Sequence, residues 1–268
     1  MEKANNEKDI KEVFELSMTD KESIKKWTPD KVNSIVSKMR YQLENSGKQC
    51  SVYAYIIDYT EKELADTQRD KAVIKDEYVW SRWRKILEAE KRINDMLGYL
   101  TLLQMDAITT SINLLQAKSD TERIMQCKHA YTILYEAKEK NLFQKVSSEM
   151  KDYPEEWIKK VEYKELWKSI RQVTNEIFST KEAKEIRDNI DAHKDNSFIK
   201  QISTYRKCEW TQSLINLTMF ISLIANLQKC MNVIKDNEKK IEEQYAAEIK
   251  EYRVWLEEMI KKMESSIN

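Results

Sequence analysis

The chain has 268 residues, with 46 Lys or Arg and 46 Asp or Glu, so its formal net charge at pH 7 is zero. A neutral chain offers nucleic acid no overall attraction, and any RNA contact must come from a local basic patch. Only 2 Gly and 2 Pro are present, and the many turns of sheets and α/β folds use these residues to reach unusual backbone angles. The composition therefore predicts an all-α multi-helix bundle with long antiparallel helices, and it excludes glycine-rich phosphate loops of the Rossmann and P-loop type.

Capping signals and apolar residues at helical spacing set the expected helices. Thr28 before Pro29 predicts one start, the capping boxes at 119–122 and 179–182 predict two more, and residues 45–47 (Asn-Ser-Gly) indicate a turn. The predicted helices cover residues 8–27, 29–45, 50–66, 72–117, 120–150, 154–178, 180–193, 198–235 and 237–264. We divide them into an N-terminal helical segment, 1–68, and a helical bundle with an extended C-terminal helix, 69–268.

The cysteines and the apolar segments indicate the cellular compartment in which the protein is expected. Cys50, Cys127, Cys208 and Cys230 form no CxxC pair, which is typical of reduced core thiols in a cytoplasmic protein rather than of disulfides or a zinc site. The run 214–227 is interrupted by polar residues and is shorter than the roughly 20 apolar residues that span a bilayer. We expect it to be the most buried helix of the bundle, with no membrane contact. No Glu-x-x-His pair exists for a di-iron site, so we expect no metal and no cofactor.

One stretch of the chain carries the residue types of a phosphodiester-cleaving site. His193 is one of only two histidines, and an imidazole can move protons in either direction at neutral pH. Arg187 can hold a phosphate through two parallel charge-assisted hydrogen bonds. Asp188 and Asn189 lie between them and can orient either group. Together these four residues would suit cleavage without a metal.

A purely structural interpretation of the same residues stays open. Arg187 and Asp191 have the i,i+4 spacing of an ordinary surface ion pair, and His193 would be a cation at a helix C-terminus. The chain supplies a control, because Arg123 and His129 have the same spacing inside a predicted helix. We interpret His129 as structural, so spacing alone decides little.

The residues around the histidine carry more information than the spacing. The run Arg-Asp-Asn-Ile-Asp-Ala-His-Lys-Asp at 187–195 resembles the signature of HEPN domains, particularly those of abortive-infection and toxin–antitoxin loci. That signature has Arg, a polar residue and then His, often with Ala before the His and Asp two residues after it. The resemblance covers this run and, loosely, the helical context of residues 70–235.

The resemblance implies a homodimer in which two such motifs face each other across a cleft and cleave RNA without a metal. The protein would be the toxin or effector of a prokaryotic defence system, with an antitoxin or another partner protein. Arg187 would hold the scissile phosphate, His193 would act as acid or base, and Asp188 or Asn189 would orient them. Some HEPN proteins are non-catalytic binding partners, and that alternative stays open. The next predicted helix supplies a basic patch for RNA: Lys200, Arg206 and Lys207.

The alternative function is a non-enzymatic helical interaction or scaffold module. Apolar residues of the last predicted helix recur at near-heptad spacing, which is typical of a docking face or a dimer seam. These seam residues are Ile241, Tyr245, Ile249, Tyr252, Leu256, Met259 and Met263. A further segment, 78–85, mixes aromatic and basic residues as single-strand binders do. However, two sets of its residues fall at helical spacing, which favours core packing: Val79, Trp83 and Ile86, and Trp80 and Leu87.

Overall fold

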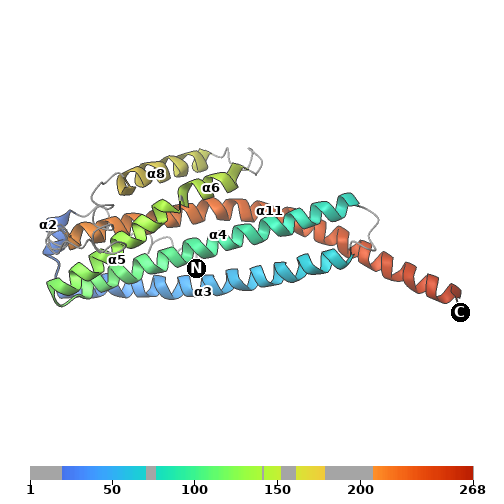
Figure 1. Ribbon diagram of the computed structural model, residues 1–268, viewed down its shortest axis with the longest axis horizontal. Helices are drawn as coiled ribbons and strands as arrows, with labels where there is room; N and C mark the ends of the chain where they lie inside the picture. Colours follow the sequence, from blue (N-terminus) through green and yellow to red (C-terminus); the bar gives the residue numbers. More distant parts are fainter. Residues whose placement is uncertain (1–19, 71–76, 141, 152–160, 179–207, 268) are drawn as a thin grey trace, which may run out of the picture.

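The computed structural model describes residues 20–70, 77–140, 142–151, 161–178 and 208–267 (Figure 1). Within these ranges every regular element is a helix and no strand occurs, which confirms the all-α prediction. The helices are α2 Lys21–Lys25, α3 Pro29–Asp70, α4 Glu77–Gln116, α5 Asp120–Glu139, α6 Leu142–Lys151, α8 Val161–Phe178 and α11 Trp210–Ile267. The predicted division of the chain at residue 68 stays a prediction.

Helices α3 and α4 form a long antiparallel pair along the molecule (Figure 1). At one end the Trp80 indole Nε1 donates a hydrogen bond of 2.6 Å to the Thr67 carbonyl. Near the other end Arg40 Nη2 donates to Gln116 Oε1 at 3.2 Å. Residue numbers rise along α3 while they fall along α4, so the two helices run in opposite directions.

Helix α11 packs along the same α4 helix, also antiparallel. Two cross-helix hydrogen bonds fix the register: Gln228 Nε2 donates to Thr101 Oγ1 at 2.8 Å, and Lys235 Nζ donates to Asn94 Oδ1 at 2.7 Å. Polar groups buried in an apolar interface must be paired to avoid a desolvation cost. These bonds therefore select one register among the many that apolar packing alone would allow.

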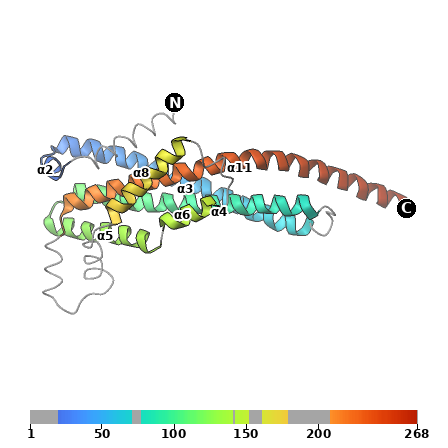
Figure 2. The same cartoon turned by 90° about the horizontal axis from the view of Figure 1, so that it is seen from above.

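The shorter helices cover the remaining sides of α11 and α4. Helix α5 packs on α4 and α11, and α6 and α8 pack on α5 and α11 (Figure 2). The rings of Phe143 in α6 and Trp167 in α8 stack with centroids 5.0 Å apart and planes inclined by 20°, a favoured aromatic geometry. Helix α2 packs near the start of α11, and Asp20 caps it by accepting from the Ser23 amide at 2.9 Å.

The core lies where α11 meets α4 and α5. Leu217, Phe220, Ile224 and Leu227 are completely buried, and burying each such side chain contributes about 1.5–3 kcal/mol. The prediction that 214–227 is the most buried helix is supported by this burial. Two buried hydroxyl groups of α4 are satisfied by their own helix: Thr101 Oγ1 donates to the Leu97 carbonyl at 2.7 Å and Ser111 Oγ donates to the Ala107 carbonyl at 2.8 Å.

One segment in the described part of the chain, Trp210–Asn237, is long and apolar enough to cross a membrane by length and composition, and its most apolar 18-residue window has a mean hydropathy of 1.3. The expectation that this region is too short and too polar to pass such a test is therefore corrected. In the structure 67% of its most apolar window is buried inside the protein. That burial is what the central helix of a bundle requires.

Three predicted helix boundaries are wrong. The turn at 45–47 does not occur, because α3 continues from Pro29 to Asp70 as one helix; a Cβ at Gly47 would meet only Met105 Cε, at 4.0 Å. Likewise α11 runs unbroken where two helices, 198–235 and 237–264, were predicted, and its sequence near 236 contains no Gly or Pro. Conversely, the predicted helix 120–150 is divided into α5 and α6.

The aromatic and basic segment of α4 belongs to the interior. Trp80 and Trp83 are only 7% and 6% exposed, and Trp83 and Leu87 form a small apolar cluster with Leu64 of α3. The Arg84 guanidinium lies 5.7 Å from the Trp80 ring centroid, within the range of a cation–π contact. The prediction of core packing is confirmed for both tryptophans, and neither ring is available for stacking on a base.

Candidate functional site

The predicted catalytic and RNA-binding residues lie outside the described residues. They occupy the part of the chain between the end of α8 at Phe178 and Cys208, just before α11. The residues concerned are Arg187, Asp188, Asn189, His193, Lys200, Arg206 and Lys207. The structure therefore describes the two helices that flank this region, and the assignment of the seven residues stays a prediction.

The start of α11 is fixed electrostatically to α2. Glu209 Oε2 accepts a hydrogen bond of 2.7 Å from Lys21 Nζ, and Glu209 Oε1 lies 3.6 Å from Lys25 Nζ. Thr211 Oγ1 also donates to Glu209 Oε1, at 3.2 Å. The hydrogen bond from Lys21 is the largest of the effects that lower the pKa of the Glu209 carboxyl. Two cations of α2, Lys21 and Lys25, therefore hold Glu209, the residue directly before α11, in place.

Arg123, the arginine of the control pair, has a structural role at the same end of the bundle. Its guanidinium lies 5.1 Å from the ring centroid of Trp210, the first residue of α11, and Nη1 lies 3.3 Å from Asp120 Oδ1. His129 is exposed on α5. Arg123 therefore connects α5 to α11, although it has the same spacing to His129 as Arg187 has to His193.

The cysteines are buried or partly buried thiols rather than exposed nucleophiles. All four are free. Burial raises the pKa of both Cys208 and Cys230 to about 12, so neither thiol ionises near neutral pH and neither is poised to act as a nucleophile. Among the described residues, no group of three or more His, Cys, Asp or Glu side chains could hold a metal ion.

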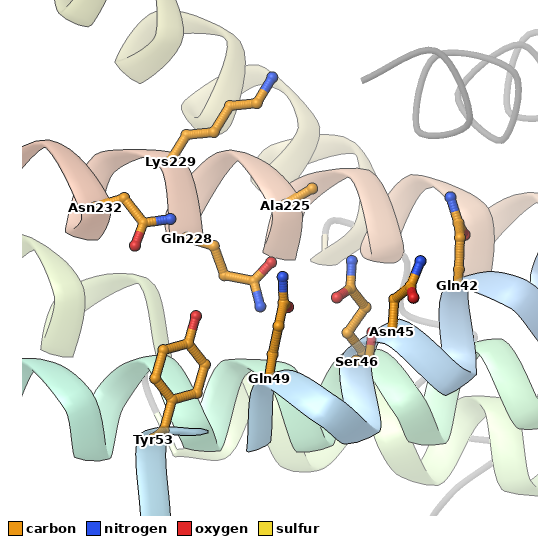
Figure 3. A pocket seen from close by; sticks show the side chains of 10 residues that line it. Gln42, Asn45, Ser46, Gln49, Tyr53, Ala225, Gln228, Lys229 and Asn232 are labelled. Atoms are coloured by element: carbon orange, nitrogen blue, oxygen red, sulfur yellow. The ribbon is translucent and has the colours of Figure 1, made fainter. Parts of the chain in front are cut away.

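A polar pocket lies between α3, α4 and α11, in the middle of the described bundle. Its volume is about 140 Å³. Its buried lining residues, which we call the floor, come from all three helices, and its exposed lining residues, which we call the rim, come from α3 and α11 (Figure 3). The floor consists of Gln42, Ser46, Gln104 and Ala225, the walls of Asn45, Tyr53 and Gln228, and the rim of Gln49, Lys229 and Asn232.

The lining is dominated by carboxamides and carries almost no charge. Six of its ten residues are Asn or Gln, and the single ionic side chain, Lys229, directs its amine away from the α3 side chains in Figure 3. Each carboxamide presents one acceptor oxygen and two N–H donors. Gln228 uses one donor to bind Thr101 Oγ1 at 2.8 Å. The pocket therefore offers a neutral surface with both donors and acceptors.

Gln42 on the floor of the pocket has a buried side-chain oxygen without a hydrogen-bond donor among the described residues. It is only 7% exposed, and no described group donates to its side-chain Oε1. A buried carbonyl oxygen without a donor costs about 1–3 kcal/mol. Such a cost is expected where a polar group is kept for binding rather than for stability.

The sequence contains a signal for this pocket in the spacing of its Asn and Gln residues, which belongs to no catalytic or metal-binding motif. Gln42, Asn45 and Gln49 recur at three and four residues along α3, and Gln228 and Asn232 are four apart on α11. Side chains at these spacings share one helix face. Carboxamides repeated on a face that otherwise packs against neighbours indicate an internal polar site.

The C-terminal part of α11 extends past the ends of α3 and α4, as Figures 1 and 2 both show. Val254 and Trp255 in this part are 50% and 51% exposed. All seven seam residues, Ile241 to Met263, lie on this continuous helix, but their side chains are outside the described part. Comparison with protein-family models, curated proteins and solved structures finds no match to this chain. The function of the chain must therefore be inferred from its own sequence and structure.

Proposed function

We propose that this chain is a HEPN-like protein that cleaves RNA without a metal ion, as the toxin or effector of a prokaryotic defence system. The observation that carries the proposal is the run 187–195, in which Arg187, a polar pair and His193 occur with the flanking Ala192 and Asp195 that the HEPN signature favours. An all-α bundle, the fold class of this chain, is also the fold class that the resemblance implies.

The proposed chemistry is transfer of the scissile phosphate to the neighbouring 2′-oxygen of the RNA. A neutral His193 removes the proton of the 2′-hydroxyl, the 2′-oxygen bonds to phosphorus, and the 5′-oxygen leaves with a proton from a second, protonated His193 of a dimer. The products are a 2′,3′-cyclic phosphate and a 5′-hydroxyl end. Arg187 neutralises the phosphate oxygens as charge develops on them.

The test uses a single-stranded RNA oligonucleotide in the presence of EDTA. We expect wild-type protein to cleave it, and we expect His193→Ala and Arg187→Ala each to lower the rate by about 10²-fold or more, the usual contribution of a general acid or base or of a charge-stabilising group. His129→Ala is the matched control, because it removes the only other histidine, which is exposed on α5. Equal rates for His193→Ala and His129→Ala would contradict the proposal, as would cleavage of an all-2′-deoxy oligonucleotide.

A second candidate function is a helical interaction module, and the projecting end of α11 is the observation that favours it. A helix that leaves its bundle with two large apolar side chains half exposed, Val254 and Trp255, exposes apolar surface that association would bury. Near-heptad spacing of the seam residues is the pattern by which helices pair. The occupant that this pattern favours is a second copy of the same helix.

The assembly state of purified protein tests this second function. A double variant, Ile249→Lys with Leu256→Lys, places two charges in the predicted seam and should convert a dimer to a monomer in sedimentation analysis. Glu251→Lys, at an exposed position of the same helix, should leave the dimer intact. If both variants sediment as the wild type does, the seam is not an interface. Full function after loss of His193, with function lost in the seam variant, would favour the module over the ribonuclease.

A further inference from the structure

The pocket between α3, α4 and α11 has the size of a single six-membered ring. Its volume is about 140 Å³, and an engineered cavity of about 150 Å³ in another protein holds one benzene molecule. An apolar ring would not suit this pocket, because carboxamides and hydroxyls dominate its lining. A suitable ligand must form hydrogen bonds with these groups through the donors and acceptors at the edge of its ring.

The near absence of charged side chains in the pocket lining limits which ligands can bind there. No acidic side chain lines the pocket, and the one cation, Lys229, lies on the exposed rim with its amine turned away from the α3 side chains (Figure 3). Burying an ionised group without a charged partner is costly. The part of the ligand that enters the pocket is therefore uncharged.

The geometry of the carboxamides favours a flat ligand with donors and acceptors side by side. A carboxamide has an oxygen and an NH₂ group in one plane, and Asn and Gln side chains use this pair to bind the edges of nucleobases. In Figure 3, Gln49 from α3 and Gln228 from α11 point toward each other across the opening, with the Tyr53 hydroxyl directed to the same space. Gln42 Oε1 at the floor accepts from no described group and is itself shielded from solvent, so a ligand N–H reaches this oxygen once the Gln42 carboxamide turns toward the opening.

From these observations we propose that the pocket binds one pyrimidine base, uracil or cytosine, whose ring N–H or amino group donates to Gln42 Oε1. A pyrimidine has one six-membered ring, no charge at neutral pH and alternating donors and acceptors on its edge. The same base can arrive as a free nucleoside or as an unpaired nucleotide of RNA. The inference does not depend on the ribonuclease proposal, because the pocket is formed entirely by described residues of three helices.

The experiment is isothermal titration of the full-length protein with uridine and cytidine, and separately with a short oligouridine. We expect uridine or cytidine to bind, and we expect Gln42→Leu to weaken that binding by about tenfold, the effect of one hydrogen bond lost at a buried site. Gln49→Leu on the exposed rim gives a second variant whose folding is not at risk, and it should weaken binding in the same direction. Gln172→Leu is the matched control, an exposed glutamine on α8, and it should bind as the wild type does.

Other outcomes either refute the proposal or identify the source of the base. No binding of any pyrimidine up to millimolar concentration would refute it, and so would equal binding by the wild type and Gln42→Leu. Adenosine or glucose binding as tightly as uridine would refute the assignment of a single pyrimidine ring. Binding of the oligouridine together with the nucleoside would identify RNA as a source of the base, whereas binding of the nucleoside alone would identify a small metabolite. Since cleavage by His193 is measured separately, failure of either proposal leaves the other unaffected.

Discussion

Replacing Gln42 with leucine should leave the protein at least as stable as the wild type, although glutamine is polar and the site is buried. Leucine is shorter than glutamine and branches at Cγ rather than at Cδ, but it still fills most of the site with apolar atoms, and it removes an oxygen that no described group satisfies. The unpaired oxygen costs about 1–3 kcal/mol, and the lost amide contacts offset part of the gain. We therefore expect the free energy of unfolding to stay equal or to rise by about 1 kcal/mol.

The same substitution at Gln228 should have the opposite effect. Gln228 Nε2 donates to Thr101 Oγ1 at 2.8 Å and helps to set the register of α11 on α4. Loss of such a bond costs about 0.5–1.5 kcal/mol. The two Gln→Leu variants should therefore differ by about 1–2 kcal/mol, or by several degrees in Tm at roughly 2–4 °C for each kcal/mol.

Urea denaturation followed by circular dichroism measures both variants, with the slope of the transition checked to be unchanged. If Gln42→Leu loses more than about 1 kcal/mol, its amide contributes to stability, and the view that it is kept for binding is wrong. If Gln228→Leu is neutral, the hydrogen bond to Thr101 does not set the register. Addition of uridine should stabilise the wild type and Gln228→Leu more than Gln42→Leu.

Three further outcomes follow from the core, the ion pairs and the thiols. Phe220→Ala, at a completely buried position of α11, should cost about 3–5 kcal/mol in urea denaturation, and a loss below 1 kcal/mol would contradict its central place. The lowered pKa of Glu209 means that its stabilising effect is present above its ordinary value of 4.5 and is lost as the pH falls further, so Glu209→Gln should flatten the acid limb of the stability profile. With a pKa of about 12, Cys230 should react with iodoacetamide at pH 8 only after unfolding, and rapid labelling of the native protein would refute its burial.

The fold class was predictable because composition and apolar spacing act over many residues at once. The scarcity of Gly and Pro favours long helices, and the helical spacing of Trp80 and Trp83 favours their burial. The structure has both tryptophans buried at helix interfaces. Ser119 caps α5 as its capping box predicts, by accepting from the Glu122 amide at 3.2 Å. The partner group differs from the prediction, because Glu122 Oε2 accepts from the Lys118 amide, at 2.6 Å, rather than from Ser119.

Helix boundaries were less predictable because tertiary packing overrides weak local signals. Asn45, Ser46 and Gly47 are typical turn residues, yet Ser46 is 5% exposed inside α3, and α3 packs along α4. The pocket could not be predicted from the sequence for a related reason. Its carboxamides come from three helices, and only the packing of those helices shows that Gln42, Gln104 and Gln228 surround one space.

The measurement that tests the proposed function most directly is incubation of purified protein with total RNA in EDTA, beside the double variant Arg187→Ala with His193→Ala. We expect that the wild type cleaves the RNA, that the chelator has no effect, and that the double variant leaves the RNA intact. Cleavage by the double variant at the wild-type rate would contradict the assignment of the run 187–195, as would cleavage that EDTA abolishes. An intact RNA in every lane would contradict the ribonuclease and leave the projecting end of α11, with its exposed Val254 and Trp255, as the feature on which function depends.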